Sequence, residues 1–170
     1  MSIKWIGAIL VIAGCGGFGF SLAHNYRREE NMLRQLMKIL DFMRCELEYR
    51  QSTLAQLCMD ASQQASGCIG KVFSLMAKEL DMQVCPDASC CMDMSLKNVR
   101  GLSRSARQVL MLLGSSIGRF DLKGQLSELE SVKRECNEML ENLMRHKETR
   151  IRNYQTLGLC AGVALAIILI

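Results

Sequence analysis

The sequence predicts an all-α protein, a helical bundle anchored in a membrane by a transmembrane helix at each end. Its composition favours helix over sheet, because the chain has one proline and only 5% aromatic residues. Apolar residues recur every three or four positions in the middle of the chain, as on the buried face of a helix. Both ends carry long uncharged, apolar runs. A chain of 170 residues holds one domain of ordinary size besides such anchors.

The two apolar ends are long enough to span a bilayer. No charged residue occurs from Trp5 to Ala23 or from Asn153 to Ile170. At a helical rise of about 1.5 Å per residue, runs of this length match a hydrocarbon core of about 30 Å. We therefore predict transmembrane helices at residues 3–24 and 154–170, in contact with the lipid bilayer, and a helical domain at 27–153.

Basic residues near these segments predict the orientation of the chain. Lys4 is the one basic residue on the far side of either segment. The side that faces the domain carries eight: Arg27, Arg28, Arg34, Lys38, Arg145, Lys147, Arg150 and Arg152. Because Lys and Arg are retained on the cytoplasmic side, we predict a cytoplasmic central domain and both termini outside the cytoplasm.

The N-terminus also allows a different interpretation. Ser21-Leu22-Ala23 fits a signal-peptide cleavage site, and Ile12-Ala13-Gly14-Cys15 resembles a lipoprotein signal. Either would make the chain an exported lipoprotein or signal-anchored adaptor on the outer face of the membrane. Export would place the basic residues after the first segment on the wrong side, and it would expose the thiols of the domain to an oxidising space. The odd number of cysteines, nine, also favours reduced thiols.

The first half of the domain reads as three helices. Apolar residues at helical spacing predict a first helix over about 28–49: Leu33, Leu36, Met37, Leu40, Met43 and Leu47. Thr53 and Gln56 form a capping-box pattern that begins a second helix, with Leu54 on its buried face. After an interruption at 66–67, a third helix runs from Ile69 and is ended by Pro86.

The second half reads as three further helices. A short, weakly patterned helix is expected over about 89–99, and Ser103 opens another that stops at Gly118. Asp121 suits the N-cap of a last helix over 122–170. Its expected buried stripe is Leu122, Leu126, Leu129, Val132, Cys136, Met139, Leu140 and Leu143.

The cysteine cluster is the feature that most resembles a metal site. Cys85, Cys90 and Cys91 supply one pair at zinc-like spacing, but a zinc site needs four ligands. Both histidines, His24 and His146, are predicted near the membrane ends of the domain. We therefore predict no bound metal and thiols that are buried or partly exposed on helices.

The sequence offers no site for a cofactor or for catalysis. Gly70-Lys71 resembles a phosphate-binding loop, but Val72 stands where that loop needs Ser or Thr. No Ser or Cys nucleophile has a histidine and an acid to activate it. The net charge of +4 is spread along the chain, which is not the footprint of a nucleic-acid-binding protein. The sequence thus predicts a protein that is not an enzyme.

The most distinctive stretch runs from residue 113 to 125. It contains Leu113, Gly114, Gly118, Asp121 and Gln125. Two readings stay open: a structural turn, in which the glycines let helices approach and the aspartate caps, or a corner that also contacts a partner.

These residues resemble those of a known family, the stage III sporulation protein AB family of endospore-forming bacteria. The family signature L-G-x-x-L-G-x-x-D-x-x-x-Q matches this stretch, with Ile117 in place of the second leucine. The resemblance extends over nearly the whole chain, through Gly19-Phe20, Glu46-Leu47-Glu48-Tyr49, Thr53-Leu54 and Tyr154-x-x-Leu157-Gly158. The proline usual between Thr53 and Leu54 is absent, and the cysteine content lies outside the family pattern.

The resemblance implies a non-enzymatic part of the secretion-like channel complex that joins mother cell and forespore. The family's cytoplasmic domain is similar to a repeated helical domain of the type II secretion inner-membrane platform protein. The implied partners are the secretion-type ATPase of the complex and the other stage III sporulation channel membrane proteins; a homo-oligomer is compatible with this role. The implied location is the mother-cell side, in the outer forespore membrane. This inference is by analogy at the level of fold and family.

Overall fold

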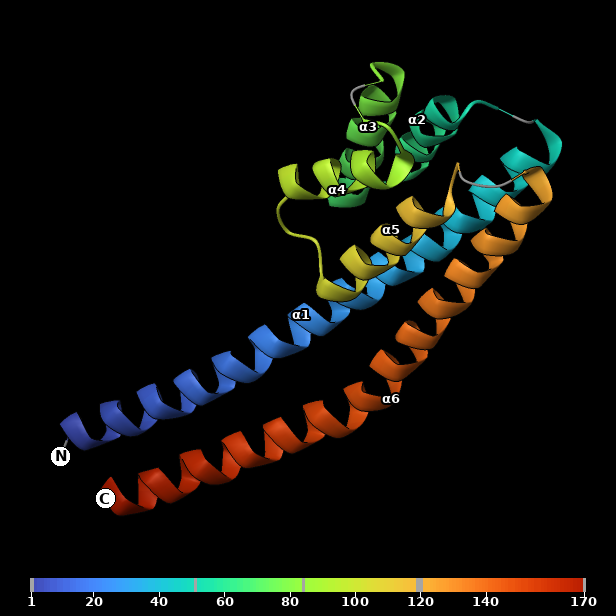
Figure 1. Ribbon diagram of the computed structural model, residues 1–170. Helices are drawn as coiled ribbons and strands as arrows, with labels where there is room; N and C mark the ends of the chain where they lie inside the picture. The colour runs from blue at the N-terminus through green and yellow to red at the C-terminus, as the bar shows by residue number, and fades with distance from the viewer. Residues whose placement is uncertain (1, 51, 84, 119–120, 170) are drawn as a thin grey trace. The chain divides into compact units, whose positions relative to one another are not determined.

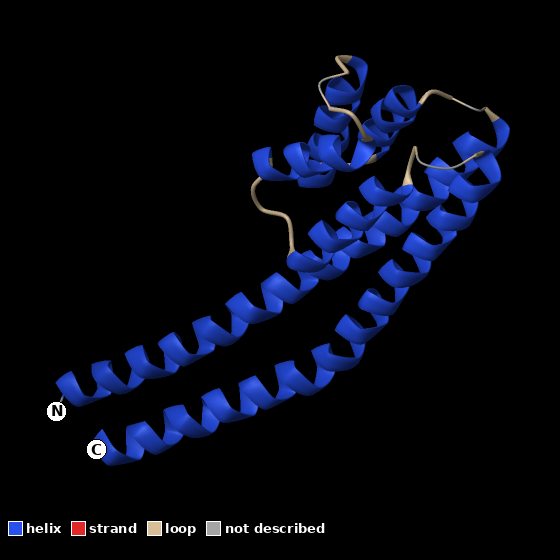
Figure 2. Ribbon diagram, in the orientation of Figure 1, coloured by secondary structure: helices blue, strands red, loops and turns tan. Residues whose placement is uncertain are grey.

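The computed structural model describes the backbone of residues 2–50, 52–83, 85–118 and 121–169, and the side chains of residues 24–50, 52–83, 85–118 and 121–145. Over these ranges the chain is helical and contains no strand (Figure 2), which confirms the all-α class. The described residues form six helices in chain order (Figure 1): α1 Ser2–Tyr49, α2 Leu54–Gln64, α3 Gly67–Asp81, α4 Ala88–Asn98, α5 Arg104–Ser116 and α6 Leu122–Leu169.

The chain divides into two compact units. One is Asn31–Leu140, and the other consists of Met1–Glu30 and Glu141–Ile170. Within the described part of the chain, no helix is both long and apolar enough to span a membrane. The predicted spans 3–24 and 154–170 lie outside the described side chains, apart from His24, and they stay predictions.

Side-chain caps begin several helices of the unit Asn31–Leu140. Thr53 and Ser103 each accept a hydrogen bond from the backbone N–H three residues on, at 3.4 and 3.1 Å, so both predicted N-caps are confirmed. Asp87 caps α4 in the same way, at 2.8 Å. The capping-box prediction was half right, because the Gln56 side chain does not reach back to Thr53. Its amide donates to Asp60 Oδ1 at 2.7 Å instead.

The core of this unit is made of the apolar stripes that the sequence indicates. In succession α2 packs on α3, α3 on α4, and α4 on α5. Phe73 of α3 is the largest fully buried side chain. The buried residues of α1 and α6 include Leu33, Leu36, Ile39, Leu40, Met43, Leu47, Leu129, Val132, Cys136 and Leu140. The spacing of three and four residues therefore identified most of the inward positions, whereas Met37, Leu126, Met139 and Leu143 are only half-buried.

Three details differ from the sequence-based expectation. Pro86 does not end α3: that helix ends at Asp81, where the chain turns and Gln83 adopts φ +52°. Pro86 lies instead just before the N-cap of α4. Leu122 is 38% exposed, because it is the first residue of α6 and lies beyond the buried stripe. Leu54 occupies the corresponding place at the start of α2 and is only half-buried.

Candidate functional site

Gly114 of α5 packs closely against α4. A Cβ atom at this position would lie 2.5 Å from Cβ and 2.9 Å from Cγ of Met92. It would also lie 3.6 Å from the carbonyl oxygen of Ala88. Any side chain would force the helices apart, so glycine sets the distance between them. Leu113, the preceding residue, is fully buried in the core.

Gly118 turns the chain out of α5. Its φ is +82°, in the left-handed region that residues with a Cβ rarely adopt. The helix ends two residues earlier, where the Ile117 N–H donates to the carbonyl oxygen of Leu113 at 3.1 Å. A Cβ on Gly118 would meet the Leu54 side chain at 3.4 Å and Ala88 Cβ at 3.8 Å. Backbone conformation therefore explains this glycine.

Asp121 begins α6. Its Oδ1 accepts a hydrogen bond of 3.1 Å from the Gly124 N–H, and its carbonyl accepts one of 2.8 Å from the Gln125 N–H. The predicted N-cap is confirmed. Asp121 is exposed and Gln125 is half-buried. Of the five residues singled out in the sequence, two are thus part of the packed interior and three lie at the turn.

Two residues of α4 complete this arrangement, and sequence reasoning missed both. Ala88 and Met92 are buried, lie four residues apart on one face of α4, and supply the surface against which the glycine positions are packed. Ala88 lies within reach of both Gly114 and Gly118. Their spacing of four residues is compatible with one helix face. The apolar pattern of this short helix is weak, however, because cysteine and polar residues lie between the apolar ones.

Antiparallel pairing brings the end of α1 to the same region. Arg44 pairs with Glu130 at 3.2 Å, and Asp41 pairs with Lys133 at 2.7 Å. The two helices therefore run antiparallel: residues later in α1 lie beside residues equally earlier in α6. Figure 1 shows this for the end of α1 and the start of α6. Continued to the end of α1, this register places Tyr49 level with the first turns of α6.

An exposed surface results at this end of the unit. Tyr49 is 80% exposed, and Leu122, next to the cap of α6, is 38% exposed. We call Tyr49, Gly118, Asp121, Leu122 and Gln125 the corner surface. An exposed aromatic residue on the same end of a helical unit as exposed polar groups is typical of a protein-contact site.

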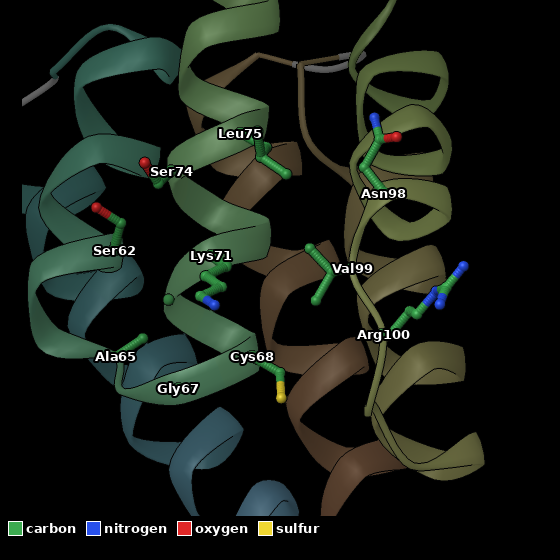
Figure 3. Close-up of a pocket in the computed structure, with 11 residues that line it drawn as sticks. Ser62, Ala65, Gly67, Cys68, Lys71, Ser74, Leu75, Asn98, Val99 and Arg100 are labelled. Atoms are coloured by element: carbon green, nitrogen blue, oxygen red, sulfur yellow. The ribbon is translucent and has the colours of Figure 1, made fainter.

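An open groove of about 780 Å³ lies between α2, α3 and the chain that follows α4 (Figure 3). Lys71 and Cys68 of α3 and Arg100 are among its eleven lining residues, and none of the eleven is a carboxylate or a histidine. Figure 3 shows the Arg100 side chain pointing away from Lys71. The groove therefore does not bring together the combination of acid, base and nucleophile that a catalytic site needs.

The cysteines of the described part differ in environment. Cys58, Cys91 and Cys136 are buried, and burial raises the pKa of Cys58 to about 12 and that of Cys136 to about 11. Cys85 and Cys90 are half-buried, with their sulfur atoms 2.8 Å apart. Over the described residues, no group of three or more His, Cys, Asp or Glu side chains is arranged to hold a metal ion.

Comparison with known proteins identifies the family. The family model described as stage III sporulation protein AB matches residues 4–170. Stage III sporulation protein AB of Bacillus subtilis (strain 168) is 23% identical over 98% of this chain and 99% of its own. A solved structure of a stage III sporulation protein AB aligns with a TM-score of 0.62 and 19% identity, over 72% of this chain and 98% of its own, which shows a shared fold. The chain belongs to the stage III sporulation protein AB family.

Proposed function

We propose that this protein is a non-enzymatic, membrane-anchored platform in the secretion-like channel complex between mother cell and forespore. It links a cytoplasmic secretion-type ATPase to the membrane proteins of that complex. Membership of a sporulation protein family supports a role in sporulation. The observation that carries the contact role is the corner surface, which combines an 80% exposed tyrosine at the end of α1 with the capped start of α6.

The proposed location is the outer forespore membrane on its mother-cell side. Residues 3–24 and 154–170 cross the bilayer, the bundle lies in the cytoplasm, and both termini lie outside. The distribution of basic residues supports this, because Arg27 and Arg28 follow the first segment while Lys4 alone precedes it. In this orientation a cytoplasmic ATPase can reach the corner surface.

A platform role suits the chemistry of the described residues. The residues that line the groove at Lys71 include no acid or imidazole, and Cys58, Cys91 and Cys136 are buried. The corner surface is instead built from contact groups. A phenol ring, an exposed leucine and a capping carboxylate supply apolar area and charge, the two ingredients of a protein interface.

The test separates contact from stability at the corner. Asp121→Ala alone should cost about 1 kcal/mol if the side chain acts only as an N-cap, which a domain stabilised by 5–15 kcal/mol on the usual scale survives. We therefore combine Asp121→Ala with Gln125→Ala. Tyr49→Ala is a second, independent variant, because that exposed ring contributes little to the core.

Ser103→Ala is the matched control. It removes an N-cap of the same kind, a hydroxyl that accepts from the Ala106 N–H at 3.1 Å. It does so at the start of α5, about 20 Å of helix away from Gly118. Sporulation counts and co-purification of the ATPase from sporulating cells are measured for each variant, together with circular dichroism of the purified full-length protein.

We expect the corner variants to fold and to reach the membrane, yet to lose ATPase co-purification and sporulation. The control should retain both. Full sporulation by both corner variants would refute the contact role and leave Asp121 a helix cap only. A second copy of the chain on the corner surface would appear as loss of self-association with ATPase binding unchanged.

A further inference from the structure

Cys85 and Cys90 form a close pair of thiols that the platform role does not use. The Cys90 S–H donates to Cys85 Sγ at 2.8 Å, and the Cys85 S–H donates to Met94 Sδ at 3.2 Å. Cys85 precedes Pro86 in the loop between α3 and α4, and Cys90 lies in the first turn of α4. Both thiols are partly open to solvent.

The separation of the two sulfur atoms favours a bond between them over a shared metal ion. A disulfide holds its sulfurs about 2.05 Å apart. Two thiolates on one tetrahedral zinc ion, each about 2.3 Å from the metal, lie about 3.7 Å apart. The observed 2.8 Å is nearer the first value. Cys91, the other thiol of the cluster, is fully buried.

We propose that Cys85 and Cys90 are a dithiol that a small-molecule disulfide of the glutathione type oxidises to an intramolecular disulfide. The thiolate of one cysteine attacks the small disulfide, forms a mixed disulfide and releases one small thiol. The second cysteine loses its proton and attacks the mixed disulfide, so that the S–S bond forms and the second small thiol leaves. Two electrons and two protons pass to the oxidant, which ends as two thiols.

The surroundings of Cys90 lower its reactivity at neutral pH. The hydrogen bond to Cys85, with smaller effects of burial and of the carboxylates of Asp87 and Asp93, raises the pKa of Cys90. Cys90 is therefore a thiol at neutral pH and reacts slowly by itself. Its proximity to Cys85 makes the second, intramolecular step fast once a mixed disulfide has formed.

The disulfide would act on the helix turn beneath the corner surface. Residues 85–90 form the closed ring, and the ring contains Ala88. A Cβ on Gly118 would lie 3.8 Å from Ala88 Cβ, and one on Gly114 would lie 3.6 Å from the Ala88 carbonyl oxygen. Oxidation thus fixes the α4 turn on which both glycines pack. Any effect on partner binding rests on the proposed function, whereas the formation of the disulfide does not.

The test treats the purified full-length protein in detergent with oxidised glutathione and sequences the tryptic peptide 79–97 by mass spectrometry. We expect this peptide to lose two hydrogen atoms, with the bond located between Cys85 and Cys90. Cys85→Ser and Cys90→Ser should each keep a glutathione adduct on the remaining thiol. The matched control Cys45→Ser, which removes an exposed single thiol, should oxidise like the wild type.

Amide hydrogen exchange gives the structural readout on the unaltered chain. The segment 82–90 should exchange more slowly after oxidation and return to its original rate after reduction, with the other helices unchanged. A wild-type protein that retains the glutathione adduct, or a bond that joins Cys91 instead, would overturn the proposal. Neither assay includes the ATPase, so a failure here is distinct from a failure of the platform role.

Discussion

Gly114→Ala probes the close approach of α4 and α5 more sharply than any other single change. The added methyl group would lie 2.5 Å from Met92 Cβ, a separation that real Cβ atoms essentially never show. Met92 Cβ is attached directly to the α4 backbone, and its side chain is 1% exposed, so it has no free space to enter. The helices themselves must therefore separate.

Two opposing terms set the size of the effect. Alanine is favoured over glycine inside a helix by about 1 kcal/mol. Forcing an extra carbon into a packed core costs about 1–3 kcal/mol, and this site belongs at the upper end because the clash is with a backbone-linked atom. The net loss should be about 2 kcal/mol, or a fall in Tm of about 8 °C for a domain of this size.

Thermal unfolding of the full-length protein in detergent, followed by circular dichroism, measures this loss. Ser115→Ala is the control, because its hydroxyl bonds only to the Leu112 carbonyl of its own helix, at 2.8 Å. It should change stability by less than about 0.5 kcal/mol. Adding Met92→Ala should relieve the contact with Cγ and leave that with Cβ, so rescue should be partial. A Gly114→Ala protein as stable as the wild type would refute the reasoning.

Three further predictions follow from single contacts. Gly118→Ala should destabilise by about 1–2 kcal/mol, because its φ of +82° strains any residue with a Cβ; an unchanged denaturation midpoint would contradict this. Asp41→Ala should cost less than about 1 kcal/mol, because the side chains of Asp41 and Lys133 in this ion pair are still 54% and 27% exposed, and the small loss should shrink further in high salt. The thiols of Cys58 and Cys136 keep their protons when folded, with pKa values raised from 9.0 to about 12 and about 11, but ionise near 9 when unfolded. The free energy of unfolding should therefore fall as pH rises above 9, and equal urea midpoints at about pH 8 and about pH 10 would contradict the assignment of buried thiols.

The sequence was sufficient for the helices because its signals are local. Apolar spacing located the inward faces of α1 and α6, and the N-caps at Thr53, Ser103 and Asp121 depend on a donor only three residues away. The prediction that α3 ends at Pro86 was wrong. A proline prevents a helix from continuing past it, but the helix can end earlier. The chain had already left α3 through the turn at Gln83.

The candidate site was predictable in part. Gly114 and Gly118 stand out in the sequence, but the surface they pack against belongs to Ala88 and Met92 in another helix. Tyr49 is over sixty residues from the turn in sequence, and only the pairing of α1 with α6 places it level with the first turns of α6. Such contacts depend on tertiary packing, which periodicity within one helix does not reveal.

The platform account requires the helical unit to lie in the cytoplasm, because a cytoplasmic ATPase reaches the corner surface only there. A membrane-impermeant maleimide applied to intact cells tests this directly. Cys45 is exposed in the unit, and Ser2→Cys places a thiol at the N-terminus. The account predicts that Ser2→Cys is labelled in intact cells, while Cys45 is labelled only after the membrane is permeabilised. Labelling of Cys45 in intact cells would contradict the account and favour an exported adaptor on the outer face.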